Sequence, residues 1–219
     1  MKRTIWCALG LTVTVANGCS VLAPIPDRSR YFTLSAPADT GGGEVPHGGQ
    51  SDGVSLVYGL GPVSLPAYLD RNQVATRLSP SEVTYSQWDR WAEPLGDTVP
   101  GVLRQNLASE LGSGAVVSYP WLGTTHVDYQ IAVQLQRFET DATGESRLAG
   151  HWSIRDLRRD RLLIARDTSL ARPGPPNDTA AATTALRGML ADLGREIATA
   201  ARDLRPAGPA PRKDRPKKP

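Results

Sequence analysis

Residues 127–136 alternate between apolar and polar side chains, and this pattern constrains the fold more than any other feature of the sequence. The apolar positions are Val127, Tyr129, Ile131, Val133 and Leu135, and the polar positions are Asp128, Gln130, Gln134 and Gln136. A period of two residues is typical of a β-strand with one buried face and one solvated face. The chain must therefore build a sheet that other elements cover on one side.

The pattern also predicts how this strand continues. Its phase shifts at Phe138, which predicts a β-bulge. Further strand patterns follow across Gly144 and across residues 158–160, so three consecutive strands form an antiparallel meander.

Shorter strands are expected elsewhere in the chain. One covers residues 54–60 and is broken by Gly61-Pro62, and another covers 115–119. Residues 73–78 and 82–88 form a hairpin.

Two helices complete the prediction. The first begins at a cap formed by Asp97 or Thr98, has Pro100 in its first turn and ends at Gly112. The second is capped by Asp178 and carries an apolar stripe. The stripe consists of Ala182, Leu186, Met189, Leu190, Leu193, Ile197, Ala200 and Leu204.

The stripe could pack on the sheet or lie on a membrane. Its polar face mixes acidic and basic residues without the cationic excess of membrane-surface helices, which favours packing on the sheet. The expected class is α+β, an antiparallel sheet with a long three-strand meander and two helices packed on one face.

The N-terminus has the pattern of a signal peptide. Lys2 and Arg3 precede an apolar run over residues 5–16, and Cys19 follows Gly18. We expect residues 1–18 to be removed and Cys19 to carry the lipid of a bacterial lipoprotein. The alternative is a soluble secreted protein whose cysteine is incidental.

Composition divides the remaining chain. Residues 19–53 are rich in Gly, Pro, Ser and Asp and are expected to form the anchor and a flexible linker, in which only residues 31–34 resemble a strand or docking segment. Residues 54–204 are the expected folded domain. Residues 205–219 form a basic Pro-rich tail, expected to be disordered and either functionally silent or in contact with an anionic surface.

Charge and reactive side chains exclude several classes of function. The total charge is +3, the two N-terminal basic residues contribute +2 and the tail contributes +5, so residues 4–204 carry −4 and do not favour nucleic-acid binding. Both cysteines, Cys7 and Cys19, lie in the first twenty residues, and the three histidines lack ligand spacing. No metal site, cofactor motif or catalytic constellation is identified, so the protein is predicted not to be an enzyme.

Two sequence clusters are more distinctive than core packing requires. They are residues 63–77 (VSLPAYLDRNQVATR) and 88–95 (WDRWAEPL). Following a lipoprotein leader and the YFTL segment at 31–34, they resemble the PqiC (YmbA-like) family. Members of this family are auxiliary lipoproteins of ABC-type lipid transport systems that use MCE-domain proteins.

The resemblance implies an outer-membrane lipoprotein that faces the periplasm, is anchored through Cys19 and docks on an MCE-domain protein. It also implies assembly into a ring of identical subunits. A periplasmic binding protein for a small apolar ligand or lipid, held between sheet and helices, is the alternative function.

The large side chains of the two clusters are candidates for partner binding. They are Tyr68, Arg71, Trp88, Arg90 and Trp91. Aromatic and arginine side chains fill cores as well as interfaces, so a structural role for the same residues stays open.

Overall fold

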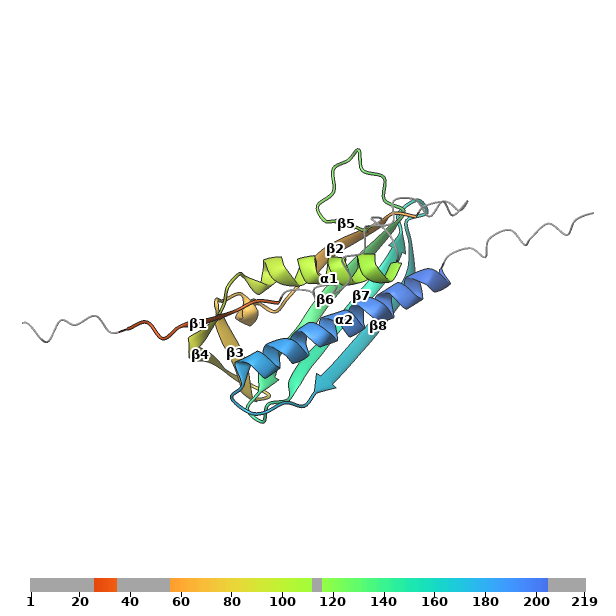
Figure 1. The fold of residues 1–219 in the computed structure, drawn as a ribbon. Helices are drawn as coiled ribbons and strands as arrows, with labels where there is room; N and C mark the ends of the chain where they lie inside the picture. Colours follow the sequence, from red (N-terminus) through yellow and green to blue (C-terminus); the bar gives the residue numbers. More distant parts are fainter. Residues whose placement is uncertain (1–25, 35–55, 112–115, 205–219) are drawn as a thin grey trace, which may run out of the picture.

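The computed structural model describes residues 26–34, 56–111 and 116–204. These residues form one mixed sheet and two long helices (Figure 1). In chain order the elements are β1 (Arg30–Phe32), β2 (Tyr58–Ser64), the short 3-10 helix η2 (Ala67–Leu69), β3 (Gln73–Ser79), β4 (Glu82–Trp91), α1 (Leu95–Leu111), β5 (Val116–Ser118), β6 (Tyr129–Asp141), β7 (Ser146–Asp156), β8 (Arg161–Arg172) and α2 (Thr179–Asp203).

The predicted meander is confirmed. β6, β7 and β8 pair antiparallel in sequence order, and the alternating residues of β6 point their apolar side chains into the core. The β6–β7 register shifts between Leu135 and Arg137, which is the bulge indicated by the change of phase at Phe138.

The sheet as a whole is mixed rather than antiparallel. β2 pairs parallel with both β5 and β6, β3 pairs parallel with the end of β6, and β1 pairs parallel with β4. The β3–β4 hairpin is antiparallel, as expected. Alternation reveals that a segment is a strand but not which strand lies beside it, and parallel neighbours need long crossover connections that leave no local signature.

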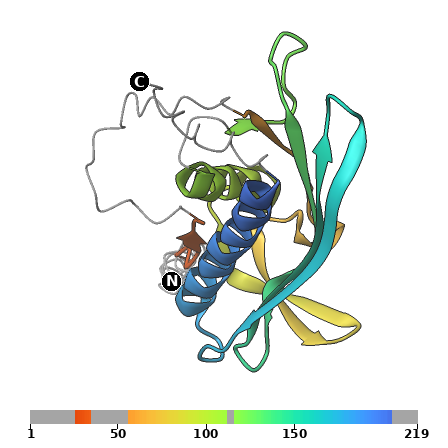
Figure 2. The same cartoon turned by 90° about the vertical axis from the view of Figure 1, so that its right-hand side faces the viewer.

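Both helices cover the same face of the sheet, where Figure 2 shows them side by side. The core lies between helices and sheet, and the predicted stripe of α2 faces it, with its two end residues half-buried. The carboxylate of Asp178 caps α2 by accepting a hydrogen bond from the Ala181 N–H at 2.9 Å. At Gly194 a side chain would lie 2.9 Å from Cβ of Asn106, so this glycine lets α1 and α2 approach closely.

Helix α1 begins earlier than the sequence indicated. The N–H groups of Asp97 and Thr98 both donate to the carbonyl of Pro94, each at 3.1 Å, so the first turn already exists where a cap was expected. Pro100 consequently lies inside the helix, beyond the first turn.

Strand β1 extends the core toward the N-terminus. The strand expected within residues 31–34 is confirmed, and Leu34 just after it is only 1% exposed. The hydrophobic core therefore includes a side chain on the N-terminal side of residue 54. No helix within residues 26–34, 56–111 and 116–204 combines the length and apolar character needed to cross a bilayer. Cys19, the leader and the tail lie outside the described residues.

Burial of Leu34 predicts that the segment before residue 54 contributes to stability. Leu34→Ala should lower the free energy of unfolding by about 2–5 kcal/mol, because it removes a fully buried side chain and leaves a cavity. The matched control Leu122→Ala, at a side chain 75% exposed, should change stability by less than about 0.5 kcal/mol. Urea denaturation of both variants makes the comparison, and equal effects would contradict a structural role for this segment.

Candidate functional site

The two distinctive sequence clusters meet at one end of the molecule. This end is built from β1, η2 and the β3–β4 hairpin (Figure 1). Two buried carboxylates, Glu139 and Asp89, hold these elements together.

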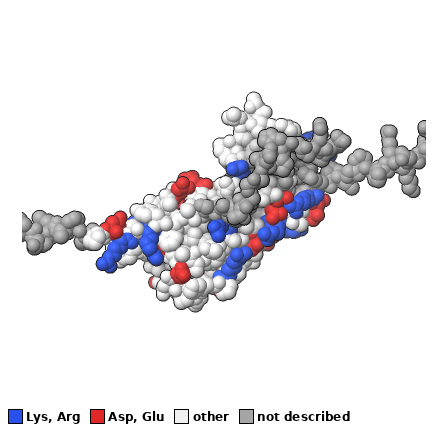
Figure 3. Space-filling view, in the orientation of Figure 1, with Lys and Arg blue, Asp and Glu red and all other residues white. Residues whose placement is uncertain are grey.

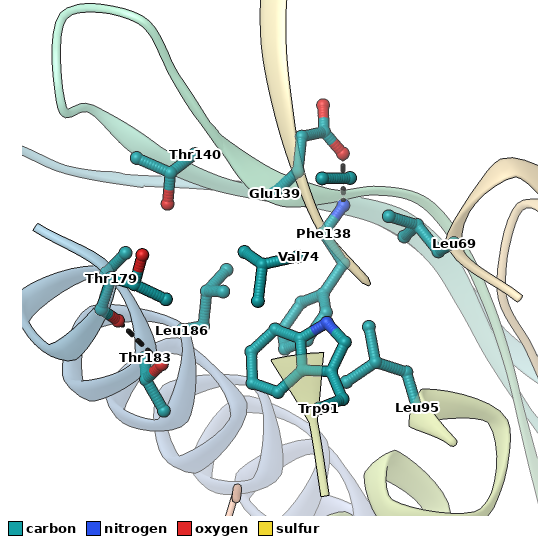
Figure 4. A pocket seen from close by; sticks show the side chains of 12 residues that line it. Leu69, Val74, Trp91, Leu95, Phe138, Glu139, Thr140, Thr179, Thr183 and Leu186 are labelled. Atoms are coloured by element: carbon teal, nitrogen blue, oxygen red, sulfur yellow. Dashed lines mark hydrogen bonds between the residues drawn. The ribbon is translucent and has the colours of Figure 1, made fainter. Parts of the chain in front are cut away.

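Glu139 is the centre of the first polar network. It is 2% exposed and accepts hydrogen bonds from Nε of Arg77 at 2.7 Å, Nε of Arg137 at 2.9 Å and the Tyr68 hydroxyl at 2.8 Å. It also accepts the N–H of Phe138 at 2.8 Å, shown as a dashed line in Figure 4. Tyr68 lies on η2, Arg77 on β3 and the other two on β6, so one carboxylate connects three elements.

The network fixes the protonation of its members. Burial by itself raises the pKa of Glu139, but the hydrogen bonds from Arg77, Tyr68 and Arg137 outweigh burial and hold this pKa below its ordinary value. Burial, together with the bond to Glu139, raises the pKa of Tyr68 to about 12. At neutral pH Glu139 is therefore a carboxylate and Tyr68 a neutral phenol. In these states the Tyr68 hydroxyl donates to Glu139 and so connects η2 to β6.

Asp89 is the centre of the second network. It is 6% exposed and pairs with Arg30 through two hydrogen bonds, from Nε at 2.7 Å and from a terminal guanidinium nitrogen at 2.8 Å. The hydroxyl of Thr179, the first residue of α2, also donates to Asp89. Burial opposes the charge of Asp89, but Arg30 and Thr179 outweigh it and hold the pKa of Asp89 below its ordinary value. β1, β4 and α2 thus share one carboxylate.

The five candidate partner residues occupy different environments. Trp91 is 5% exposed and belongs to the core, whereas Trp88 is 38% exposed. Tyr68 is partly buried, because its hydroxyl serves the Glu139 network. Arg71 is exposed and stacks 4.8 Å from the ring centre of Tyr85, and Arg90 is partly exposed.

The structure brings Trp88 and Arg90 to one surface and separates them from Trp91. Alternation along β4 turns Asp89 and Trp91 inward and their neighbours outward. Sequence analysis did not single out Glu139. Its available signal was an acidic residue immediately after Phe138, where the strand changes phase.

The described interior has little room for a ligand. A cavity of about 10 Å³ lies between the sheet and α2, lined by residues that include Val74, Trp91, Phe138 and Leu186 (Figure 4). This volume is about that of one water molecule and is far too small for an acyl chain. The small cavity therefore favours a protein that binds other proteins over the alternative, a protein that binds a small ligand between sheet and helices.

A second hollow lies on the surface at the β3–β4 turn and has a volume of about 590 Å³. Its three arginines already have carboxylate partners: Arg77 and Arg137 pair with Glu139, and Arg147 pairs with Glu145. Within residues 26–34, 56–111 and 116–204, no group of three His, Cys, Asp or Glu side chains is placed to hold a metal ion.

The Glu139 network predicts a pH-dependent contribution to stability. Glu139→Gln should lower the free energy of unfolding at pH 7 by about 3 kcal/mol, because it leaves a buried cluster without its negative charge. The folded-state pKa of Glu139 is depressed, so its contribution is complete above the unfolded value of 4.5 and is lost as pH falls through the folded value. The stability difference between wild type and variant should therefore shrink on acidification below about pH 4.5, as measured by urea denaturation.

Glu145→Gln is the matched control, because Glu145 forms a more exposed pair with Arg147. It should cost at most about 1 kcal/mol at pH 7. A Glu139→Gln difference that stays constant with pH would contradict the assignment of Glu139 as a buried carboxylate.

Trp88 and Trp91 form a second matched pair. Trp91→Ala should cost about 3–5 kcal/mol of stability, because it empties a large core position. Trp88→Ala should change the melting temperature much less, because Trp88 is more exposed. Calorimetry on the two variants tests the difference, and a large loss in both would assign Trp88 a packing role.

Two solved structures share this fold. A crystal structure of an uncharacterised protein is 20% identical, with a TM-score of 0.63 over 79% of this chain and 98% of that chain. A protein from Xanthomonas campestris is 22% identical, with a TM-score of 0.59 over 68% of this chain and 88% of that chain. At these identities the likeness concerns the fold alone.

No curated protein matches the sequence. Residues 32–198 match a family described as the ABC-type transport auxiliary lipoprotein component. The matched region begins in β1 and ends within α2, so it includes the Glu139 network and both sequence clusters, together with Asp89 and Thr179 of the second network. The chain belongs to the family of ABC-type transport auxiliary lipoproteins, which has the PqiC (YmbA-like) character indicated by its sequence.

Proposed function

We propose that this protein is a non-catalytic assembly component of an MCE-type ABC system that transports lipids between the inner and outer membranes. Lipids on Cys19 hold it to the outer membrane, and its folded domain faces the periplasm. The observation that carries this proposal is the family match over residues 32–198, downstream of a leader expected to end at Gly18, immediately before Cys19. The MCE-domain protein is the proposed partner, and several copies assemble as a ring.

The interior of the domain supports an assembly role. Glu139 and Asp89 each connect three elements through hydrogen bonds, and such fully paired networks hold the elements in fixed positions. The cavity between the sheet and α2 is about 10 Å³, so this space does not hold a lipid, and the domain is better suited to offering surfaces to partners.

The exposed members of the candidate set supply contacts outside the chain. Arg71, Trp88 and Arg90 retain exposed surface, whereas Tyr68 and Trp91 act from inside by positioning η2 and β4. An exposed tryptophan beside arginines is the composition found at binding surfaces.

Acylation of Cys19 is the first test. Mass spectrometry of the membrane-extracted protein should show a lipid-modified N-terminus at Cys19, and Cys19→Ser should release the protein into the soluble periplasmic fraction. Two or three acyl chains make anchoring durable, whereas one chain binds reversibly. Cys7→Ser is the control and should leave the protein in the membrane, because Cys7 lies within the leader. An unmodified mature N-terminus in the wild type would refute the anchor.

Association with the transporter is the second test. After mild cross-linking in cells, the wild-type protein should co-purify with an MCE-domain protein. The core variant Trp91→Ala should lose the partner only in proportion to its loss of folded protein. Absence of any MCE-domain protein from the cross-linked material would contradict the proposed partnership.

A further inference from the structure

An aromatic and basic surface lies on the outer side of the β1–β4 edge. We call it the tether-side surface and define it as Tyr31, Trp88 and Arg90, together with the exposed Arg28, which lies two residues before β1. Tyr31 and Arg90 are register partners, and Trp88 precedes Arg90 by two residues on β4. Tyr31 is 64% exposed and Trp88 is 38% exposed.

The strand pairing explains why these side chains point outward. The neighbouring register pair, Arg30 and Asp89, joins its side chains on the inner side, next to α2. Since successive residues of a strand point to opposite faces, Tyr31 and Arg90 lie on the outer side.

A bulge in β4 shapes the same surface. Residues 85–90 of β4 oppose only residues 73–75 of β3, so β4 carries extra residues at this point. The Ser86 hydroxyl oxygen accepts the N–H of Trp88 at 3.3 Å and the N–H of Asp89 at 2.9 Å, which stabilises the bulge. Trp88 is thus exposed by a defined local structure.

The basic side chains of this surface are available to anions. In the described part of the chain, neither Arg28 nor Arg90 has a carboxylate oxygen within 4.0 Å. Arg90 makes one long hydrogen bond, 3.4 Å from Nε to the Ser29 hydroxyl, and Asp27 is the acidic residue that interacts electrostatically with it. Figure 3, which shows the side covered by the helices, has both basic and acidic side chains at the β1 end of the molecule.

The chain length before β1 restricts where this surface can be. Seven residue steps join Cys19 to Pro26, the first described residue. An extended chain spans at most 3.3–3.6 Å per residue, so this segment reaches no farther than about 25 Å. A lipid on Cys19 therefore keeps the β1 end of the domain near the membrane surface.

We propose that the tether-side surface contacts the headgroup layer of the membrane that holds the lipid anchor. The inference rests on the proposed acylation of Cys19 and identifies what Trp88 and Arg90 bind. Tryptophan and tyrosine prefer the boundary between headgroups and acyl chains, where the ring is buried and its polar edge stays hydrated. Arg28 and Arg90 pair with the phosphates of anionic lipids. The short reach from Cys19 favours lipid over a protein partner at this surface.

Cys19 is the only cysteine of the mature chain, which allows a direct test. Residues 19–219 are coupled through the Cys19 thiol to a maleimide lipid in phosphatidylcholine–phosphatidylglycerol vesicles whose acyl chains are brominated near the headgroup. Bromine quenches tryptophan fluorescence only at short range. The coupled wild type should lose fluorescence, and Trp88→Phe should remove most of that loss.

Trp121→Phe is the matched control, since the Trp121 ring lies against Gly59 of β2, at the end of the sheet away from β1. It should leave the quenching unchanged. Equal quenching in the wild type and Trp88→Phe, or no quenching at all, would overturn the proposal. A Trp88 signal that instead changes on self-association or on adding an MCE-domain protein, without vesicles, would assign the surface to protein and also overturn it.

The arginines are tested with uncoupled Cys19→Ser protein and sedimenting anionic vesicles. Arg28→Gln and Arg90→Gln should each weaken binding about fivefold, and added salt should reduce the difference. Arg161→Gln, which removes an exposed arginine of β8, should have no such effect. All variants retain the basic tail, so its contribution is the same in each. If all three substitutions weaken binding equally, net charge explains the effect and the surface has no special role.

These experiments separate the inference from the proposed function. Chemical coupling supplies the anchor, so the vesicle result does not depend on whether cells acylate Cys19. Acylation without Trp88 quenching would overturn the membrane contact and leave the proposed function intact. Trp88 quenching without acylation in cells would refute the anchor while showing that the surface binds lipid when placed beside it.

Discussion

The ion pair between Arg30 and Asp89 is the interaction on which the N-terminal end of the structure depends. Strand β1 has only three residues, too few for backbone pairing alone to hold it at the edge of a sheet. The two hydrogen bonds from Arg30 to a carboxylate 6% exposed supply a fixed geometry, and Thr179 joins the first turn of α2 to the same group. The strand that begins the described chain is therefore bonded to both layers of the domain.

Burial of a carboxylate costs free energy of desolvation, and hydrogen bonds from surrounding donors offset this cost. For Asp89, Asp128 and Glu139 desolvation is the largest influence on the pKa, yet in each case the pKa is lowered because several hydrogen bonds act against burial. Asp128 accepts the N–H of Val57 at 2.9 Å and also pairs with Arg158, which fixes the start of β2 beside β6. All three carboxylates connect segments far apart in the sequence. Their role is to specify which strands meet.

Sequence alone predicted the elements and their antiparallel neighbours well, but it did not predict the parallel neighbours. The local pattern of apolar and polar residues predicts the meander, the bulge at Phe138 and the N-cap and apolar stripe of α2. Each of these features depends on side chains within a few residues of one another. The parallel pairing of β2 with β6 and of β1 with β4 depends on contacts about 60–70 residues apart, which no local pattern encodes. Glu139 was missed for the same reason, since its donors Tyr68 and Arg77 precede it by 71 and 62 residues. Trp88 and Trp91 were both chosen as candidates because they are aromatic. The alternation and the bulge of β4 show that the Trp88 ring is exposed and the Trp91 ring lies in the core.

The position of the two networks determines how a tether at the N-terminus orients the domain. Arg30–Asp89 joins β1 to β4 and α2, and Glu139 joins the neighbouring hairpin to β6, the first strand of the meander. If the chain is held just before β1, the hydrogen bonds of the two networks therefore restrain the rest of the domain as well. β5 and the segment after it, which carries the exposed Tyr119 and Leu122, lie at the opposite end of the sheet (Figure 1). The proposed attachment at residue 19 consequently holds the β1 end of the sheet near the membrane, and it leaves the exposed Tyr119 and Leu122 at the opposite end.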